Sequence, residues 1–131
     1  MPNIHDLTAY LKSADMGIDP DVYTASTYTS TAIDAQGFTK ALFSVHMGTL
    51  GSSATVNFKV QDATATGGSY ADVTDAAIEE QTQGGTDASD SVVLLEVDIV
   101  PGRPFLKGVL VLGTATSDLG ASVLLYNPRS K

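Results

Sequence analysis

The chain has 131 residues, no cysteine and a formal net charge of −8. This length fits one domain, and the absence of cysteine excludes disulfide bonds, thiolate catalysis and cysteine-based metal sites. Hydrophobic residues make up 43% of the chain and charged residues 17%, a composition typical of a folded domain.

The acidic residues are unevenly distributed along the chain. Nine of them and no basic residue lie between Lys59 and Arg103, which disfavours nucleic acid as a partner because phosphate needs a basic surface. The pattern is typical of a solvated, self-repelling surface, and a site for a cationic partner is the alternative. No apolar run approaches the about 20 residues of a membrane span, so we expect no membrane association. The start, MPNIHDLTAY, lacks the basic and apolar regions of a signal peptide, so we expect synthesis in the cytoplasm without export by that route.

Residues 1–21 are expected to form an N-terminal arm, separate from a β domain over residues 22–131. Apolar residues from Ile4 to Leu11 recur at helical spacing, which predicts a short helix that ends before Gly17. So short a helix is marginal alone and must dock on a surface. We expect it to contact a neighbouring subunit, and folding back over its own domain is the alternative. The interaction residues of the arm would be Ile4, Leu7, Tyr10, Leu11 and Met16.

The next segments carry the pattern of β-strands. Residues 22–31 are rich in Thr and Tyr and predict a shallow edge strand. Over residues 38–61, apolar and polar residues alternate in two runs joined by the turn-rich GTLGSS, which predicts a β-hairpin with one buried face. That buried face would carry Ala41, Phe43, Val45, Met47, Val56, Phe58 and Val60.

Three further strands are expected in the second half of the chain. Residues 71–78 predict a short strand or helical turn, and residues 79–90 an exposed acidic loop. Residues 91–99 alternate, although Val92 and Leu94 make the first half of this strand apolar on both faces. Residues 105–114 are apolar on both faces as in a central strand, and residues 121–126 form the last strand. The pattern predicts an all-β fold, an antiparallel β-sandwich or jelly roll. Its core would contain Phe43, Val45, Val56, Phe58, Val60, Leu95, Val97, Val109 and Val111.

The central strand also raises the question of self-association. If Val109 and Val111 face the core, then Leu106, Leu110 and Leu112 lie on the opposite face. One domain would leave these leucines uncovered. We therefore expect a homo-oligomer, with a trimer favoured.

Few residues of the sequence point to chemistry. His5 and His46 have no partner at metal-ligand spacing, and the glycines match no phosphate-binding motif. Six acids of the second half lack the spacing of a calcium loop, so we expect no metal and no cofactor; they are Asp72, Asp75, Glu79, Glu80, Asp87 and Asp90. We expect a protein that is not an enzyme.

From residue 32 to the end, the order of segments resembles the decoration (cement) proteins of tailed-bacteriophage capsids. The similar segments are AIDAQGFTKALFSVHMGTL, SATVNFKVQDATATGGSYADVTDAA and, after the acidic loop, RPFLKGVLVLGTATSDLGASVLLYNPR. The resemblance implies a β-sandwich on the outside of an icosahedral head, often trimeric, that bridges adjacent subunits of the major capsid protein and stabilises the assembled shell. It brings no catalytic motif with it.

Two other functions compete with this interpretation. One is a different phage structural role, in the tail or at the head–tail junction. The other is a carbohydrate-binding β-sandwich module that uses tyrosines as a stacking platform; the candidates are Tyr23, Tyr28, Tyr70 and Tyr126.

Overall fold

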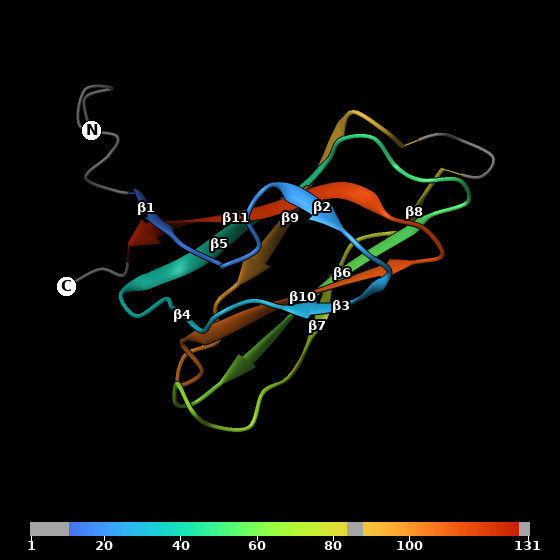
Figure 1. The fold of residues 1–131 in the computed structure, drawn as a ribbon. Helices are drawn as coiled ribbons and strands as arrows, with labels where there is room; N and C mark the ends of the chain where they lie inside the picture. Colours follow the sequence, from blue (N-terminus) through green and yellow to red (C-terminus); the bar gives the residue numbers. More distant parts are fainter. Residues whose placement is uncertain (1–10, 84–87, 129–131) are drawn as a thin grey trace, which may run out of the picture.

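The computed structural model describes residues 11–83 and 88–128, which form two antiparallel β-sheets packed face to face (Figure 1). The first sheet contains β1 (Leu11–Ala14), β2 (Asp21–Tyr23), β5 (Phe38–Met47), β9 (Ser91–Asp98) and β11 (Ser117–Pro128). The second contains β3 (Ser26–Thr29), β4 (Ile33–Asp34), β6 (Thr55–Ala63), β7 (Ala71–Ala77), β8 (Gln81–Thr82) and β10 (Phe105–Gly113). The predicted all-β sandwich is confirmed.

The order of strands places long strands in the middle of each sheet. The first sheet runs β1-β11-β5-β9, and β2 also pairs with β11. The second runs β3-β10-β6-β7, with β4 paired to β10 and β8 to β6. The described residues contain no helix long and apolar enough to cross a membrane.

The predicted hairpin between residues 38 and 61 is wrong in its pairing. β5 pairs with β11 and β9, whereas β6 pairs with β10, β7 and β8 in the other sheet. The two strands face each other across the core, where the ring centroids of Phe43 and Phe58 lie 5.7 Å apart. Alternation shows which face of a strand is buried and leaves open whether the next strand lies beside it or opposite it.

The face of β10 that points inward is also opposite to the one predicted. Leu106, Leu110 and Leu112 are buried in the core, while Val111 is 36% exposed. Val109 lies on the same outer face as Val111, but it is 8% exposed, so its predicted burial is confirmed although its predicted face is wrong. Alternation cannot select a face in a strand that is apolar on both sides. One domain covers these leucines, so they no longer support the predicted trimer.

The other predicted core positions agree with the structure. The phenylalanines and valines of β5 and β6 are buried, as is Val97 of β9, whereas Leu95 is only partly buried. The core therefore lies between β5 and β6, and extends from there under β10 and β11.

One side of the sandwich is closed by the segment that connects β1 and β2. Met16 and Ile18 of this segment insert into the core, and each is 2% exposed. The Met16 carbonyl accepts a 2.9 Å hydrogen bond from the Thr31 amide beside the second sheet, and the Ile18 carbonyl accepts one of 3.0 Å from Ala121 in the first. Gly108 of β10 makes room for Met16, because a Cβ at that glycine would lie 2.7 Å from the Met16 Cε. The segment thus ties the two sheets together.

Candidate interaction surface

The opposite side of the sandwich is open. There β9, at the edge of the first sheet, lies next to β7, at the edge of the second. A groove of about 490 Å³ runs between them. Its apolar lining is Val73, Ala76, Val97 and Val100, and its carboxylates are Asp62, Asp72, Asp75, Glu96 and Asp98. This surface combines an apolar floor with acidic walls.

The outer face of β9 carries the largest exposed apolar side chains of this side. Val92 is 53% exposed and Leu94 is 60% exposed. They alternate with the inward-facing side chains of the strand, and Glu96 and Asp98 continue the same outer row. β9 pairs with β5 along one edge, and no strand among residues 11–83 and 88–128 pairs with its other edge. An unpaired apolar edge strand is a template for another strand.

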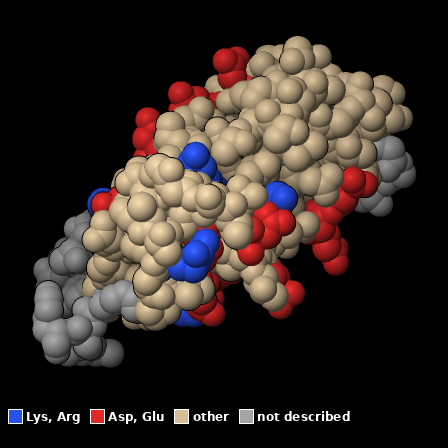
Figure 2. All heavy atoms as spheres, turned by 90° about the horizontal axis from the view of Figure 1, so that it is seen from below, with Lys and Arg blue, Asp and Glu red and all other residues tan. Residues whose placement is uncertain are grey.

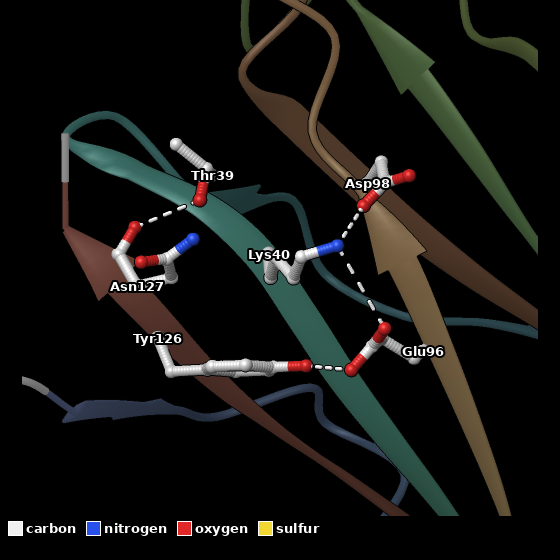
Figure 3. Close-up of polar contacts among 6 residues, drawn as sticks. All are labelled: Thr39, Lys40, Glu96, Asp98, Tyr126 and Asn127. Atoms are coloured by element: carbon white, nitrogen blue, oxygen red, sulfur yellow. Dashed lines mark hydrogen bonds and ion pairs between the residues drawn. The ribbon is translucent and has the colours of Figure 1, made fainter.

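A polar cluster occupies the acidic end of β9 (Figure 3). Lys40 Nζ lies 2.5 Å from Asp98 Oδ1 and 3.8 Å from Glu96 Oε1, and the Tyr126 hydroxyl donates to Glu96. The hydrogen bond to Asp98 raises the pKa of Lys40. The hydrogen bond to Glu96 raises the pKa of Tyr126, because the protonated phenol donates this bond to a carboxylate and is stabilised by it. One ammonium group thus faces two carboxylates, and this end of β9 keeps a negative charge.

The β7 wall of the groove has a different arrangement. Asp72 accepts hydrogen bonds from Gln61 Nε2 at 2.9 Å and from Lys59 Nζ at 3.2 Å. Both hydrogen bonds lower the pKa of Asp72, and the bond from Gln61 has the larger effect. Asp75 has φ of 61°, and the register between β6 and β7 shifts in this region. β7 is therefore an irregular edge, unlike β9.

At the end of the groove lies an ion pair that is partly shielded from solvent. Arg103 Nε lies 2.7 Å from Asp62 Oδ1, and its Nη2 donates to the Asp62 carbonyl, also at 2.7 Å. Asp62 is 5% exposed. This carboxylate is paired within the domain and serves the fold, so it adds little to the acidity that the groove offers to a partner.

The acids that the sequence raised as a possible ion site do not converge. Among the described residues, no three or more histidines or carboxylates lie where they would hold a metal ion. Asp72 is held by Lys59 and Gln61, and Glu80 accepts a hydrogen bond from Asn57 at 2.8 Å. Asp87 lies outside the described residues.

The predicted interaction residues of the arm fall in different places. Ile4, Leu7 and Tyr10 lie outside the described residues, as does His5. Leu11 begins β1, which pairs with β11, so this part of the expected helix is a strand. Met16 is buried in the core of its own domain, and the expectation that it contacts a neighbour is corrected. The described part of the arm, residues 11–21, thus belongs to the sandwich: it contributes β1, the start of β2 and the segment that closes one side.

The four tyrosines do not form a common platform. Tyr23 and Tyr28 make an edge-to-face contact at 4.7 Å and pack against the core. Tyr70 lies under Lys107, whose Nζ is 4.5 Å from the ring centroid, and Tyr126 belongs to the cluster around Lys40. Each hydroxyl bonds within the domain. The remaining candidate, His46, is exposed on the outer face of β5.

Val92 and Leu94 are surface residues to which the sequence interpretation gave no role. A signal for them was present, because both are apolar at positions where the alternation of residues 91–99 calls for polar side chains. This signal can be interpreted only when β9 is known to lie at the edge of its sheet. That position depends on the whole topology.

No protein-family model and no curated protein sequence matches the chain. A chain in the structure of infectious bursal disease virus, Gx strain, has a similar fold, with a TM-score of 0.53 and 11% identity. The match covers 88% of this chain and 31% of the viral one, so this chain spans about a third of the viral chain. At this identity the similarity describes the fold alone.

Two other solved structures are similar at lower TM-scores. A chain from disulfide-linked pili that form Bacillus endospore appendages has a TM-score of 0.43 and 18% identity, over 92% of this chain and 90% of that one. The CBM22-1–GH10 modules of Clostridium thermocellum xylanase 10B have a TM-score of 0.47 and 9% identity, over 93% of this chain and 29% of that one.

Proposed function

We propose that the protein is a structural component of a phage virion that decorates the outer surface of an icosahedral head and stabilises it. Its partner would be the major capsid protein, and its role would be to bridge capsid subunits without catalysis. The observation that carries this proposal is the exposed apolar row of β9, Val92 and Leu94, beside an acidic groove and on a sheet edge that no strand of the described residues covers. Such a surface is typical of protein–protein contacts.

Two further considerations support the role. The order of segments from residue 32 onward resembles decoration proteins of tailed phages. Part of the viral chain described above has a similar fold, so the fold suits the role, although it occurs in other kinds of protein.

The mechanism follows from selective binding. A protein that binds the assembled shell more tightly than free subunits lowers the free energy of the shell, because binding to one state shifts the equilibrium toward it. Contacts to several adjacent subunits at once increase the effective affinity. Stabilisation then grows with occupancy and needs no chemical step.

The test uses heads that lack the protein. The coding sequence is disrupted in the genome that carries it, the heads are purified, and recombinant protein is added back. We expect saturable binding to heads, no binding to free capsid subunits, and a higher temperature of DNA release from decorated heads. Heads that bind none of the added protein, or that bind it without any gain in heat resistance, would contradict the proposal.

A further inference from the structure

We propose that the free edge of β9 accepts an extended segment of the shell protein as an additional strand. The segment would place apolar side chains beside Val92 and Leu94, and basic side chains beside Glu96 and Asp98. This inference rests on the proposed function and specifies which surface makes the contact and what chemistry the partner segment has.

The backbone of β9 is suited to strand addition. It pairs with β5 through eight consecutive positions, from Lys40 opposite Asp98 to Met47 opposite Ser91, without a register shift. A regular edge strand presents an ordered row of amide and carbonyl groups, and an incoming strand continues the ladder. β7 is the contrasting edge, because its pairing with β6 is interrupted and Asp75 has φ of 61°. Irregularities of this kind protect an edge from pairing.

The outer row of β9 specifies the side chains of the partner. Side chains of an added strand lie directly beside those of β9 on the same face, and such cross-strand pairs favour apolar with apolar and opposite charges. Val92 and Leu94 are 53% and 60% exposed, and the carboxylates of Glu96 and Asp98 share the single ammonium group of Lys40. The matching segment therefore has an apolar half and a basic half.

A second copy of this chain fits the edge poorly. In an antiparallel pair of two β9 strands, a register with Leu94 opposite Leu94 places Val92 opposite Glu96. A register with Val92 opposite Leu94 places Asp90, the residue before β9, opposite Glu96. Each register sets a carboxylate against an apolar or acidic neighbour, and the chain carries a net charge of −8. The carboxylates thus favour a basic partner over a second copy.

The net charge of −8 supports the same conclusion, because an acidic molecule attracts a basic segment. On the face shown in Figure 2, acidic side chains lie along much of the margin, basic side chains lie toward the middle, and a large part of the face carries no charge. Attraction of a basic segment to the open side weakens as salt is added, because exposed charges are screened. Salt dependence is therefore a signature of this mode of binding.

The first experiment uses a peptide probe and the full chain. The ¹⁵N-labelled protein is titrated with the peptide KTKTVTV, whose lysines lie opposite Asp98 and Glu96, and whose valines lie opposite Leu94 and Val92, in an antiparallel pair. The matched control is ETETVTV. We expect chemical-shift changes concentrated in residues 91–98, binding of the basic peptide about fivefold or more tighter at low salt, and loss of this preference at high salt.

Two substitutions locate the site. Leu94→Lys places a cation on the outer row of β9 and should weaken KTKTVTV binding about fivefold or more. Val22→Lys is the control, because Val22 is 61% exposed on β2, near the opposite edge of the same sheet. It should leave binding unchanged. Equal affinity for both peptides, shifts outside residues 91–98, or equal effects of the two substitutions would overturn the inference.

Binding of the variants to heads tests this inference separately from the proposed function. Wild-type protein and Val22→Lys should bind heads equally, and Leu94→Lys should bind several-fold more weakly. If Leu94→Lys decorates heads as wild type does, the β9 edge is not the contact, while the decorating role stands. If the peptide binds β9 but heads bind no protein, the added strand does not come from the shell protein. Self-association that increases with concentration and is abolished by Leu94→Lys would assign the edge to a second copy instead.

Discussion

The two sides of the sandwich differ in how the edges of the two sheets are covered. On the closed side, the edges are divided into the short strands β1 to β4, and residues 15–20 cross between the sheets with Met16 and Ile18 in the core. On the open side, β7 and β9 run for seven and eight residues, and among residues 11–83 and 88–128 no strand pairs with the outer edge of β9. Short, covered edges resist pairing, whereas a long regular edge invites it. The closed side thus serves the fold, and the difference supports the proposal that the open side contacts a partner.

The largest expected effect concerns the core that both sides share. Phe58→Ala removes a side chain that is 2% exposed and contacts Phe43. Loss of its burial and the cavity left behind should lower the free energy of unfolding by about 3–5 kcal/mol. Denaturant unfolding followed by circular dichroism measures this change. Val111→Ala, at a partly exposed position of β10, is the control and should cost far less.

The next prediction compares the two sides directly. Met16→Ala should cost about 2–5 kcal/mol because it opens a cavity between the sheets, whereas Leu94→Ala on the open side should change stability by about 0.5 kcal/mol or less. The same unfolding assay applies to both variants. Similar costs would show that the closed side is no more important to the fold than the open one.

A smaller effect is expected from the ion pair at the end of the groove. Arg103→Met leaves the Asp62 carboxylate, 5% exposed, without its guanidinium partner. Breaking a pair that is only partly shielded should cost about 1–3 kcal/mol. The double variant with Asp62→Asn should recover part of that loss, and unfolding curves that show no recovery would mean that the arginine acts through packing alone.

The smallest effect is a pH dependence at the β7 wall. The pKa of Asp72 is lowered in the folded protein by its bonds to Gln61 and Lys59. A lowered folded pKa means that the unfolded chain binds the proton more readily, so the stabilisation is present above the unfolded pKa and is lost as the pH falls through the folded one. Asp72→Asn should therefore flatten the acid limb of the stability–pH curve. Because Asp72 is exposed, an unchanged limb would show that solvent screens the interaction fully.

The sequence predicted burial better than it predicted pairing. Alternation correctly assigned Phe43, Val45, Val56, Phe58 and Val60 to the core, because a period of two reports directly on which face of a strand meets water. It could not assign β5 and β6 to different sheets, because both arrangements bury the same faces. It also failed at β10, where both faces are apolar and the neighbouring strands decide which one points inward.

The candidate surface was predicted less well than the fold. The sequence placed the interaction in the arm, but Met16 is a core residue, because it fits between the sheets where Gly108 leaves space. Helical spacing in residues 4–11 also gave no indication that Leu11 begins a strand beside β11. The exposure of Val92 and Leu94 follows from the place of β9 at a sheet edge, which local sequence does not encode.

Hydrogen exchange on decorated heads tests the central claim most directly. The exchange of the amides of β9 is compared, by mass spectrometry, between free protein and protein bound to heads, with β1 and β2 on the closed side as the internal reference. An added strand occupies the free amides of the β9 edge, so the account predicts slower exchange over residues 91–98 on binding and unchanged exchange over residues 11–14 and 21–23. Protection confined to the closed side, with none over residues 91–98, would contradict it.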